Sequence, residues 1–160
     1  MRGAAIILAG WLVAGAAGAQ GGGHGMHDYM RLYSVQGSFE DVRDDLELAI
    51  TGRGIKINNI AYIGRMLART AREVGATRQV FVEAQAFEFC SATVSRATME
   101  ANPHNIVFCP YVIAVYVLPE EPDRVYIAYR RPELVGDAAS RRALAAVDKL
   151  LADIVAEVVQ

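Results

Sequence analysis

Cys90 and Cys109 are the residues of this sequence best suited to carry out chemistry. Cys90 lies at the end of one predicted strand and Cys109 at the start of the predicted central strand, and a helix predicted between them returns the chain to the sheet. Three alternatives follow: a structural disulfide that closes a loop of about 20 residues, two buried unpaired thiols, or a reactive pair. In a reactive pair Cys90 is the better nucleophile, because it directly precedes a predicted helix start, whose dipole favours the thiolate.

The polar and aromatic side chains near the cysteines could line a ligand site or could simply be solvated. Glu88 shares a strand face with Cys90, and a carboxylate beside a thiol raises the thiol pKa and works against the thiolate. The spacing of the two cysteines is not C-x-x-C, which excludes a thioredoxin-type motif. The candidate ligand-lining residues are His104, Glu88, Tyr111, Tyr129 and Arg130.

The three histidines are weak candidates for metal ligands. His24 and His27 flank Met26 in a glycine-rich tail that could hold a soft or borderline metal, although a solvated tail is the simpler interpretation. His104 could join the two cysteines, but that set lacks the local spacing of a zinc site. The sequence has no C-x-x-C-H motif, which excludes covalent haem attachment through that motif. No cofactor is predicted, and binding of a metal or haem stays an open alternative.

The N-terminus is typical of a secretory signal peptide. A short positive region is followed by an apolar run over residues 4–16 and by Ala17-Gly18-Ala19, so the predicted cut follows Ala19. The apolar run is shorter than the roughly 20 residues that span a bilayer, which argues against a stable membrane anchor. We therefore expect a periplasmic or secreted protein. In such an oxidising compartment an isolated cysteine pair is usually a disulfide.

The composition is that of one globular domain. The 160 residues are 53% apolar and 21% charged, which supplies material for a core and argues against disorder. The net charge of −2 and the scarcity of lysine, with only Lys56 and Lys149, indicate neither a nucleic-acid site nor an anionic-membrane site. The sequence also lacks a G-x-S-x-G elbow, a P-loop, an H-E-x-x-H motif and a Rossmann glycine pattern.

Hydrophobic periodicity predicts a single compact α+β domain over residues 31–160, after a flexible tail rich in glycine and histidine over residues 20–30. Strands are predicted at 31–36, 55–60, 80–90, 106–118 and 124–130, and helices at 39–51, 61–74, 91–101 and 138–158. This order, βαβαβαββα, favours a mixed, mostly antiparallel sheet with helices packed on it. The strand over 106–118 is the most apolar, and we expect it to be central and buried on both faces.

Three segments resemble the family of domain of unknown function 302. They are SFEDVRDDLELAITGRGIKI (38–57), FCSATVSRATMEANPHNIVFCPYVIAVYVLP (89–119) and RVYIAYRRP (124–132). The resemblance extends over residues 31–158 and implies a compact α+β domain that commonly self-associates and has no established activity. Cys90 and Cys109 fall where the family commonly has cysteines. The sequence departs from the family at Ser91-Ala92, where many members have a proline nearby, and over 58–76, which is longer and more helical than the family link.

These observations favour an exported, non-enzymatic binding or accessory domain, which we expect to be a homodimer with a small-molecule or protein partner. The first alternative is a thiol-based redox or sulfur-carrier protein that uses Cys90 and Cys109. The second alternative is metal or haem binding. The segment over 58–76 could build or cover a ligand site, because it is the largest departure from the family pattern.

Overall fold

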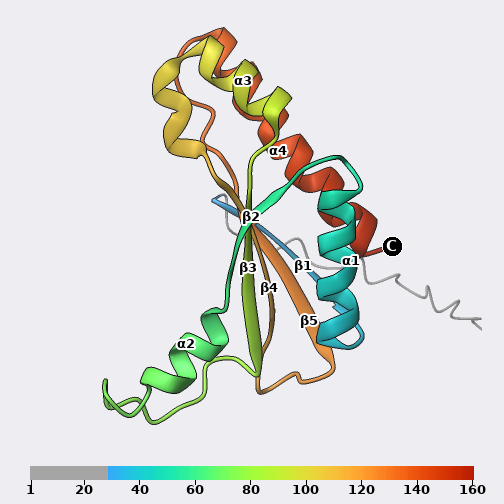
Figure 1. Ribbon diagram of the computed structural model, residues 1–160, viewed down its shortest axis with the longest axis vertical. Helices are drawn as coiled ribbons and strands as arrows, with labels where there is room; N and C mark the ends of the chain where they lie inside the picture. The colour runs from blue at the N-terminus through green and yellow to red at the C-terminus, as the bar shows by residue number, and fades with distance from the viewer. Residues whose placement is uncertain (1–28) are drawn as a thin grey trace, which may run out of the picture.

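The computed structural model describes residues 29–160, and all statements about structure below concern those residues. The chain alternates strands and helices before it ends in a β-hairpin and a long helix (Figure 1). The elements are β1 (Met30–Gln36), α1 (Phe39–Thr51), β2 (Ile57–Ala61), α2 (Ile63–Thr70), β3 (Glu83–Phe89), α3 (Ala92–Ala101), the 3₁₀ helix η1 (Pro103–Phe108), β4 (Tyr111–Val117), β5 (Arg124–Arg130) and α4 (Ala138–Val158). The predicted α+β class and the order βαβαβαββα are confirmed.

The five strands form one sheet in the order β1-β5-β4-β3-β2. All four pairings between the described strands are antiparallel, so the parallel pair that a mixed sheet would need is not found among them. The central position of β4 agrees with its apolar composition. Because β3 and β4 are antiparallel neighbours, the end of one and the start of the other lie at the same edge of the sheet.

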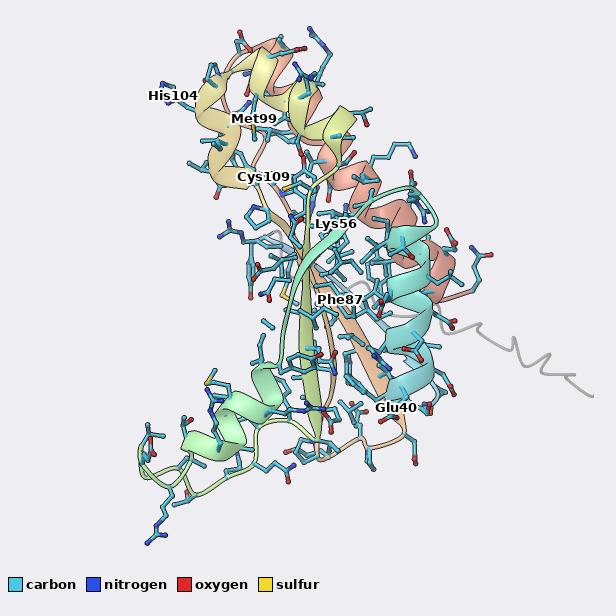
Figure 2. The ribbon with its side chains drawn as sticks, in the orientation of Figure 1. Glu40, Lys56, Phe87, Met99, His104 and Cys109 are labelled. Atoms are coloured by element: carbon cyan, nitrogen blue, oxygen red, sulfur yellow. The ribbon has the colours of Figure 1, made fainter. Side chains whose placement is uncertain are left out.

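One face of the sheet packs against α1 and α4 and forms the core (Figure 1). Alternate strand residues point into this layer, as the two-residue period of a strand requires. Phe87 is fully buried and lies between the sheet and α1 (Figure 2). The other fully buried large side chains are Phe89, Leu46, Ile50, Ile113, Ile127, Leu144, Ile154, Val115, Val125, Val147 and Val155.

Three helices begin at side chains that cap them. The hydroxyl of Ser38 accepts the N–H of Asp41 at 3.1 Å, and the hydroxyl of Ser91 accepts the N–H of Val94 at 3.4 Å. The carboxylate of Asp137 accepts the N–H of Ser140 at 2.8 Å. Each cap satisfies a backbone donor that has no partner within its helix, which fixes where the helix starts.

The opposite face of the sheet is covered only in part, by α2 (Figure 1). No residue of α2 is buried, and Val112 on this face of β4 is 40% exposed. Gly64 allows α2 to approach β3 closely, because a Cβ at this position would lie 2.9 Å from the backbone nitrogen of Ala84. The prediction that the central strand is buried on both faces is therefore wrong, since the buried positions of β4 alternate with one exposed and two half-buried positions.

Three predicted elements are clearly shorter in the structure than the sequence pattern suggests. The strand predicted over 80–90 spans only Glu83–Phe89. The predicted strand over 106–118 begins only at Tyr111, because Pro103 opens the 3₁₀ helix η1 and the side chain of Asn102 caps it by accepting the N–H of His104 at 3.0 Å. The predicted helix over 61–74 ends at Thr70, and residues 71–75 form turns up to Gly75, whose φ of 67° favours glycine.

No helix within residues 29–160 combines the length and the apolar character needed to cross a membrane.

Candidate functional site

The pairing of β3 with β4 brings the two cysteines together. Phe89 and Tyr111 lie directly opposite each other at the end of this pairing. Cys90 directly follows Phe89, and Cys109 lies two residues before Tyr111, so both leave the sheet at the same point. Their Sγ atoms are 2.8 Å apart, both thiols are free, and both residues are half-buried. The predicted proximity of Cys90 and Cys109 is thus observed, and the separation is about 0.8 Å longer than a disulfide bond.

A row of polar side chains continues inward from the cysteine pair. The Sγ of Cys109 lies 3.4 Å from the hydroxyl of Ser95, which lies 3.1 Å from the phenol oxygen of Tyr111. Ser95 and Tyr111 are both buried, and the ring of Tyr111 packs edge-on against Phe89. The cysteines are therefore the outer end of a packed, hydrogen-bonded group rather than a pair in an open cleft.

The surroundings of Cys90 favour its neutral form. Burial, together with the hydrogen bond and charge of Cys109, raises the pKa of Cys90 to about 11, while a backbone hydrogen bond from Tyr111 acts in the opposite direction. The start of α3 therefore does not produce the low thiol pKa that a nucleophilic cysteine needs. Burial also raises the pKa of Tyr111 above its ordinary value.

A second buried polar group fixes the segment that carries Cys109. The side-chain nitrogen of Asn105 donates to the carbonyl of Thr98 at 3.0 Å and to the hydroxyl of Ser140 at 2.8 Å. These contacts tie η1 to both α3 and α4, and all three side chains are buried. Because a buried polar group is costly when its partners are lost, this group holds η1, and with it Cys109, in one position.

The other predicted ligand-lining residues do not form one site. His104 is exposed on η1 and points away from the body of the protein, well apart from Cys109 (Figure 2). Glu88 lies on β3 opposite Val112. Tyr129 is buried in the core, where burial raises its pKa well above the usual range. Only Tyr111 and Arg130 share a cavity, a space of about 140 Å³ beside the start of β4.

The described residues contain no group of three or more histidine, cysteine or acidic side chains placed to hold a metal ion. The proposed cluster of Cys90, His104 and Cys109 is therefore not assembled in this structure. His24 and His27 lie outside the described residues, so the structure gives no account of the tail as a metal site.

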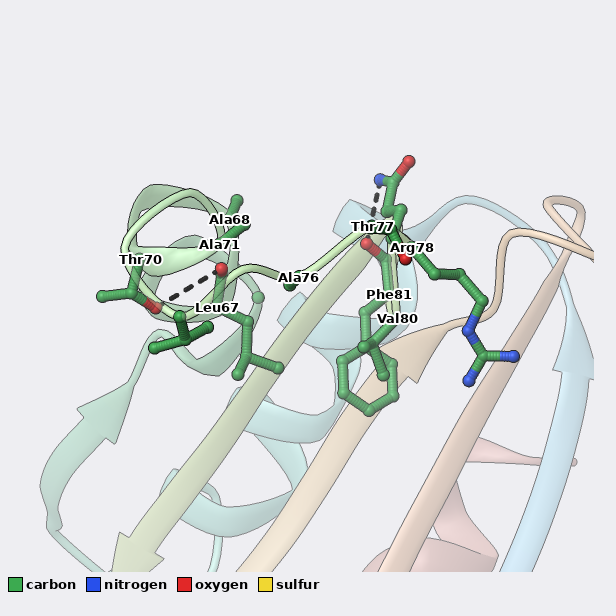
Figure 3. A pocket seen from close by; sticks show the side chains of 12 residues that line it. Leu67, Ala68, Thr70, Ala71, Ala76, Thr77, Arg78, Val80 and Phe81 are labelled. Carbon is green, nitrogen blue, oxygen red and sulfur yellow. Dashed lines mark hydrogen bonds between the residues drawn. The ribbon is translucent and has the colours of Figure 1, made fainter.

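A larger groove lies far from the cysteines, on the segment that projects from the open face of the sheet. We call residues 62–82, which comprise α2 and the loop after it, the arm (Figure 1). The groove has a volume of about 360 Å³ and runs between α2 and residues 76–81. Leu67 stands on its helix wall and Phe81 on its loop wall (Figure 3). A second apolar hollow of about 390 Å³, between α2 and the sheet, also contacts Phe81.

Sequence reasoning missed Ser95, Thr98 and Asn105, and it noted the arm only as an unusual segment. A signal for the first two was present, since the only buried positions of α3, Ser95 and Thr98, are polar and stand three residues apart on one helix face. Asn105 carried no such signal, because its partner Ser140 is 35 residues away in the sequence.

A family model and a solved structure match this chain. The model described as Domain of unknown function DUF302 matches residues 32–159. The fold is similar to the crystal structure of an uncharacterized conserved protein DUF302 from Bacillus stearothermophilus, with a TM-score of 0.67 and 19% sequence identity over 82% of this chain and 98% of that chain. At this identity the likeness shows the fold alone. No curated protein matches the chain significantly.

The raised pKa of Cys90 can be tested in the fully reduced protein. We expect alkylation of Cys90 to be slow at neutral pH and to increase up to a midpoint near pH 11. Cys109→Ala should move this midpoint to lower pH, because it removes the hydrogen bond and charge that raise the pKa. Ser95→Ala removes a hydroxyl that contacts Cys109 and the phenol of Tyr111, and it should leave the midpoint in place because neither contact acts on the pKa of Cys90 other than through Cys109 itself. The measurement is peptide-resolved mass spectrometry of alkylation against pH.

Stability of the reduced protein should follow the same titration. A raised pKa means that folding favours the neutral thiol, so this contribution is present below the ordinary value of 9.0 and is lost as the pH rises towards 11. An alkylation rate that already levels off at pH 8, or a midpoint that Cys109→Ala leaves unchanged, would contradict this description of the pair.

Proposed function

Because this chain belongs to the DUF302 family, whose description assigns no activity, we propose its function from its own surfaces: it is an exported, non-enzymatic binding or accessory domain. The observation that carries the proposal is the apolar surface of the arm. Six of its large apolar side chains are 36% to 74% exposed, namely Tyr62, Met66, Leu67, Val74, Val80 and Val82. Exposed apolar patches and apolar grooves mark sites of ligand or partner binding.

Export is proposed from the N-terminal sequence, with cleavage after Ala19 and a periplasmic or secreted location. In that compartment we propose that Cys90 and Cys109 form a structural disulfide, for which the 2.8 Å separation of their Sγ atoms is the support. A bridge that closes a loop of this length contributes about 3 kcal/mol to stability. It would hold α3 and η1 against the end of the sheet.

We also propose that the domain is a symmetric homodimer. The half of the open sheet face that α2 leaves uncovered includes Val112, which is 40% exposed at the centre of the sheet, opposite Glu88 of β3. A second copy that packs on this half would remove the Val112 side chain from water. A two-fold symmetric contact would bury Val112 of both copies in the same interface.

Dithiol–disulfide exchange is a second candidate function, and direct contact of two half-buried thiols is the observation that favours it. In such a protein the pair would pass its disulfide to a partner dithiol, so that one pair is reduced as the other is oxidised. The raised pKa of Cys90 argues against fast attack by this thiol, because the thiolate is the attacking species.

One experiment tests export with cleavage, the disulfide between Cys90 and Cys109, and the dimer. Native mass spectrometry of protein recovered from the exported fraction should give twice the mass of a chain that begins at Gln20 and lacks the two thiol hydrogens of Cys90 and Cys109. Val112→Asp should give the monomer, because it places a charge in the contact, whereas Ile106→Asp, at an exposed position on η1, should keep the dimer.

Each readout can fail separately. A chain that retains Met1 contradicts export with cleavage, and two thiols that label without a reductant contradict the bridge. A monomer in the unaltered protein contradicts the dimer. Equilibration with glutathione buffers distinguishes the two roles of the pair, since a structural disulfide resists reduction with a potential below about −300 mV, whereas an exchange-active pair is reduced at higher potentials.

Binding at the arm can be tested with Nile red, an uncharged apolar dye. We expect saturable binding with one dye per chain, seen as an increase in dye fluorescence. Ala71→Trp should abolish this binding because the indole fills the groove that Ala71 lines. Ala145→Trp, at an exposed position of α4, is the matched control and should bind as the unaltered protein does. Dye binding that never saturates, or that Ala71→Trp leaves intact, would refute the proposed function.

A further inference from the structure

The helix of the arm has one apolar side and one basic side. Ile63, Leu67 and Val74 share one side at helical spacing. Ile63 lines the hollow between α2 and the sheet, Leu67 lines the groove, and Val74 lines the same groove just after the end of α2. Arg65 and Arg69 lie on the other side and are exposed. Because the apolar side faces the groove, α2 is not oriented to lie on a membrane surface, which would require that side to face outwards.

The groove beside this helix and the hollow next to it are each large enough for a small apolar group. The groove between α2 and residues 76–81 and the hollow between α2 and the sheet both contact Phe81, so one side chain borders both spaces. Each volume falls within the range of small-molecule sites in proteins. Their walls are mainly apolar or small, with Leu67, Ala71 and Val80 on the first and Ala114 on the second.

The charge at the groove is positive although the chain as a whole is acidic. The arm holds four of the 16 basic residues and one of the 18 acidic residues, which leaves 12 and 17 in the rest of the chain. One of these arginines, Arg78, lines the groove, and its guanidinium lies beyond Phe81, on the side away from α2 (Figure 3). An apolar groove with a guanidinium beyond its loop wall is complementary to an apolar chain that passes Phe81 and ends in an anion.

We propose that the groove of the arm binds a single-chain anionic amphiphile, with its alkyl chain between α2 and residues 76–81 and its carboxylate paired with Arg78. This inference rests on the proposed function as a binding domain and adds the chemical class of the ligand. The apolar chain supplies most of the affinity, and the arginine selects an anionic head group over an uncharged one.

The test uses dodecanoate below its micelle concentration, dodecanol as its uncharged analogue, and the full exported chain. Both are measured by displacement of Nile red. Dodecanoate should bind about fivefold more tightly than dodecanol, which is the effect of a partly exposed ion pair. Arg78→Gln should remove this preference without weakening dodecanol. Arg96→Gln, an exposed arginine on α3, should leave both affinities unchanged.

The variants should remain folded because no residue of α2 is buried and Arg78 is exposed, and thermal unfolding checks this directly. Equal affinity for dodecanoate and dodecanol overturns the inference, and so does a preference that survives Arg78→Gln. Binding to vesicles of anionic phospholipid without displacement by dodecanoate also overturns it, in favour of a membrane surface. In all three cases Nile red can still bind in the groove, so the proposed function as a binding domain stands while the ligand class is wrong. If Nile red does not bind in the groove at all, the proposed function itself is refuted.

Discussion

Packing of α1 and α4 against one face of the antiparallel sheet is the interaction on which the rest of this structure depends. It buries the alternate large side chains of β3, β4 and β5, among them Phe87, Ile113 and Ile127. With both long helices on that face, the opposite face, which carries Ala84, Val112 and Tyr116, is left to the short helix α2. A domain of this size has too few elements to cover both faces, so apolar side chains stay exposed on the second face.

The same sheet explains the position of the cysteine pair. In the antiparallel register Phe89 lies opposite Tyr111, so the chain leaves the sheet after β3 and returns to it at β4 at the same edge. The segment between the two strands, α3 and η1, is fixed by the hydrogen bond between Asn105 and Ser140. Cys90 and Cys109 therefore meet for a topological reason. Burial and the raised pKa of Cys90 are more consistent with a structural disulfide that fixes the segment between β3 and β4 than with a nucleophile. The binding surface that we propose lies elsewhere, on the arm.

The sequence predicts much of this fold because its signals are local. Ser38 and the apolar positions of α1, the caps Ser91 and Asp137, and the long periodic run of α4 all act within a few residues. One error concerns residues 106–108, which the sequence pattern predicts as part of a strand although Pro103 and the cap at Asn102 make them part of η1. The proximity of the cysteine pair was predictable from strand order. The groove was not predictable, because it depends on how far α2 covers the sheet, and no sequence motif indicates that coverage.

The central claim is that the partly covered side of the sheet, with the arm, is the surface through which this domain binds. Hydrogen exchange of the full exported protein with and without saturating dodecanoate measures this most directly. We expect amide hydrogen exchange to become slower only in residues 62–82 and in the neighbouring backbone of β3. The reason is that α2 has no buried residues, so we expect it to open readily in the free protein. Protection centred on residues 90–110, or none at all, would contradict it.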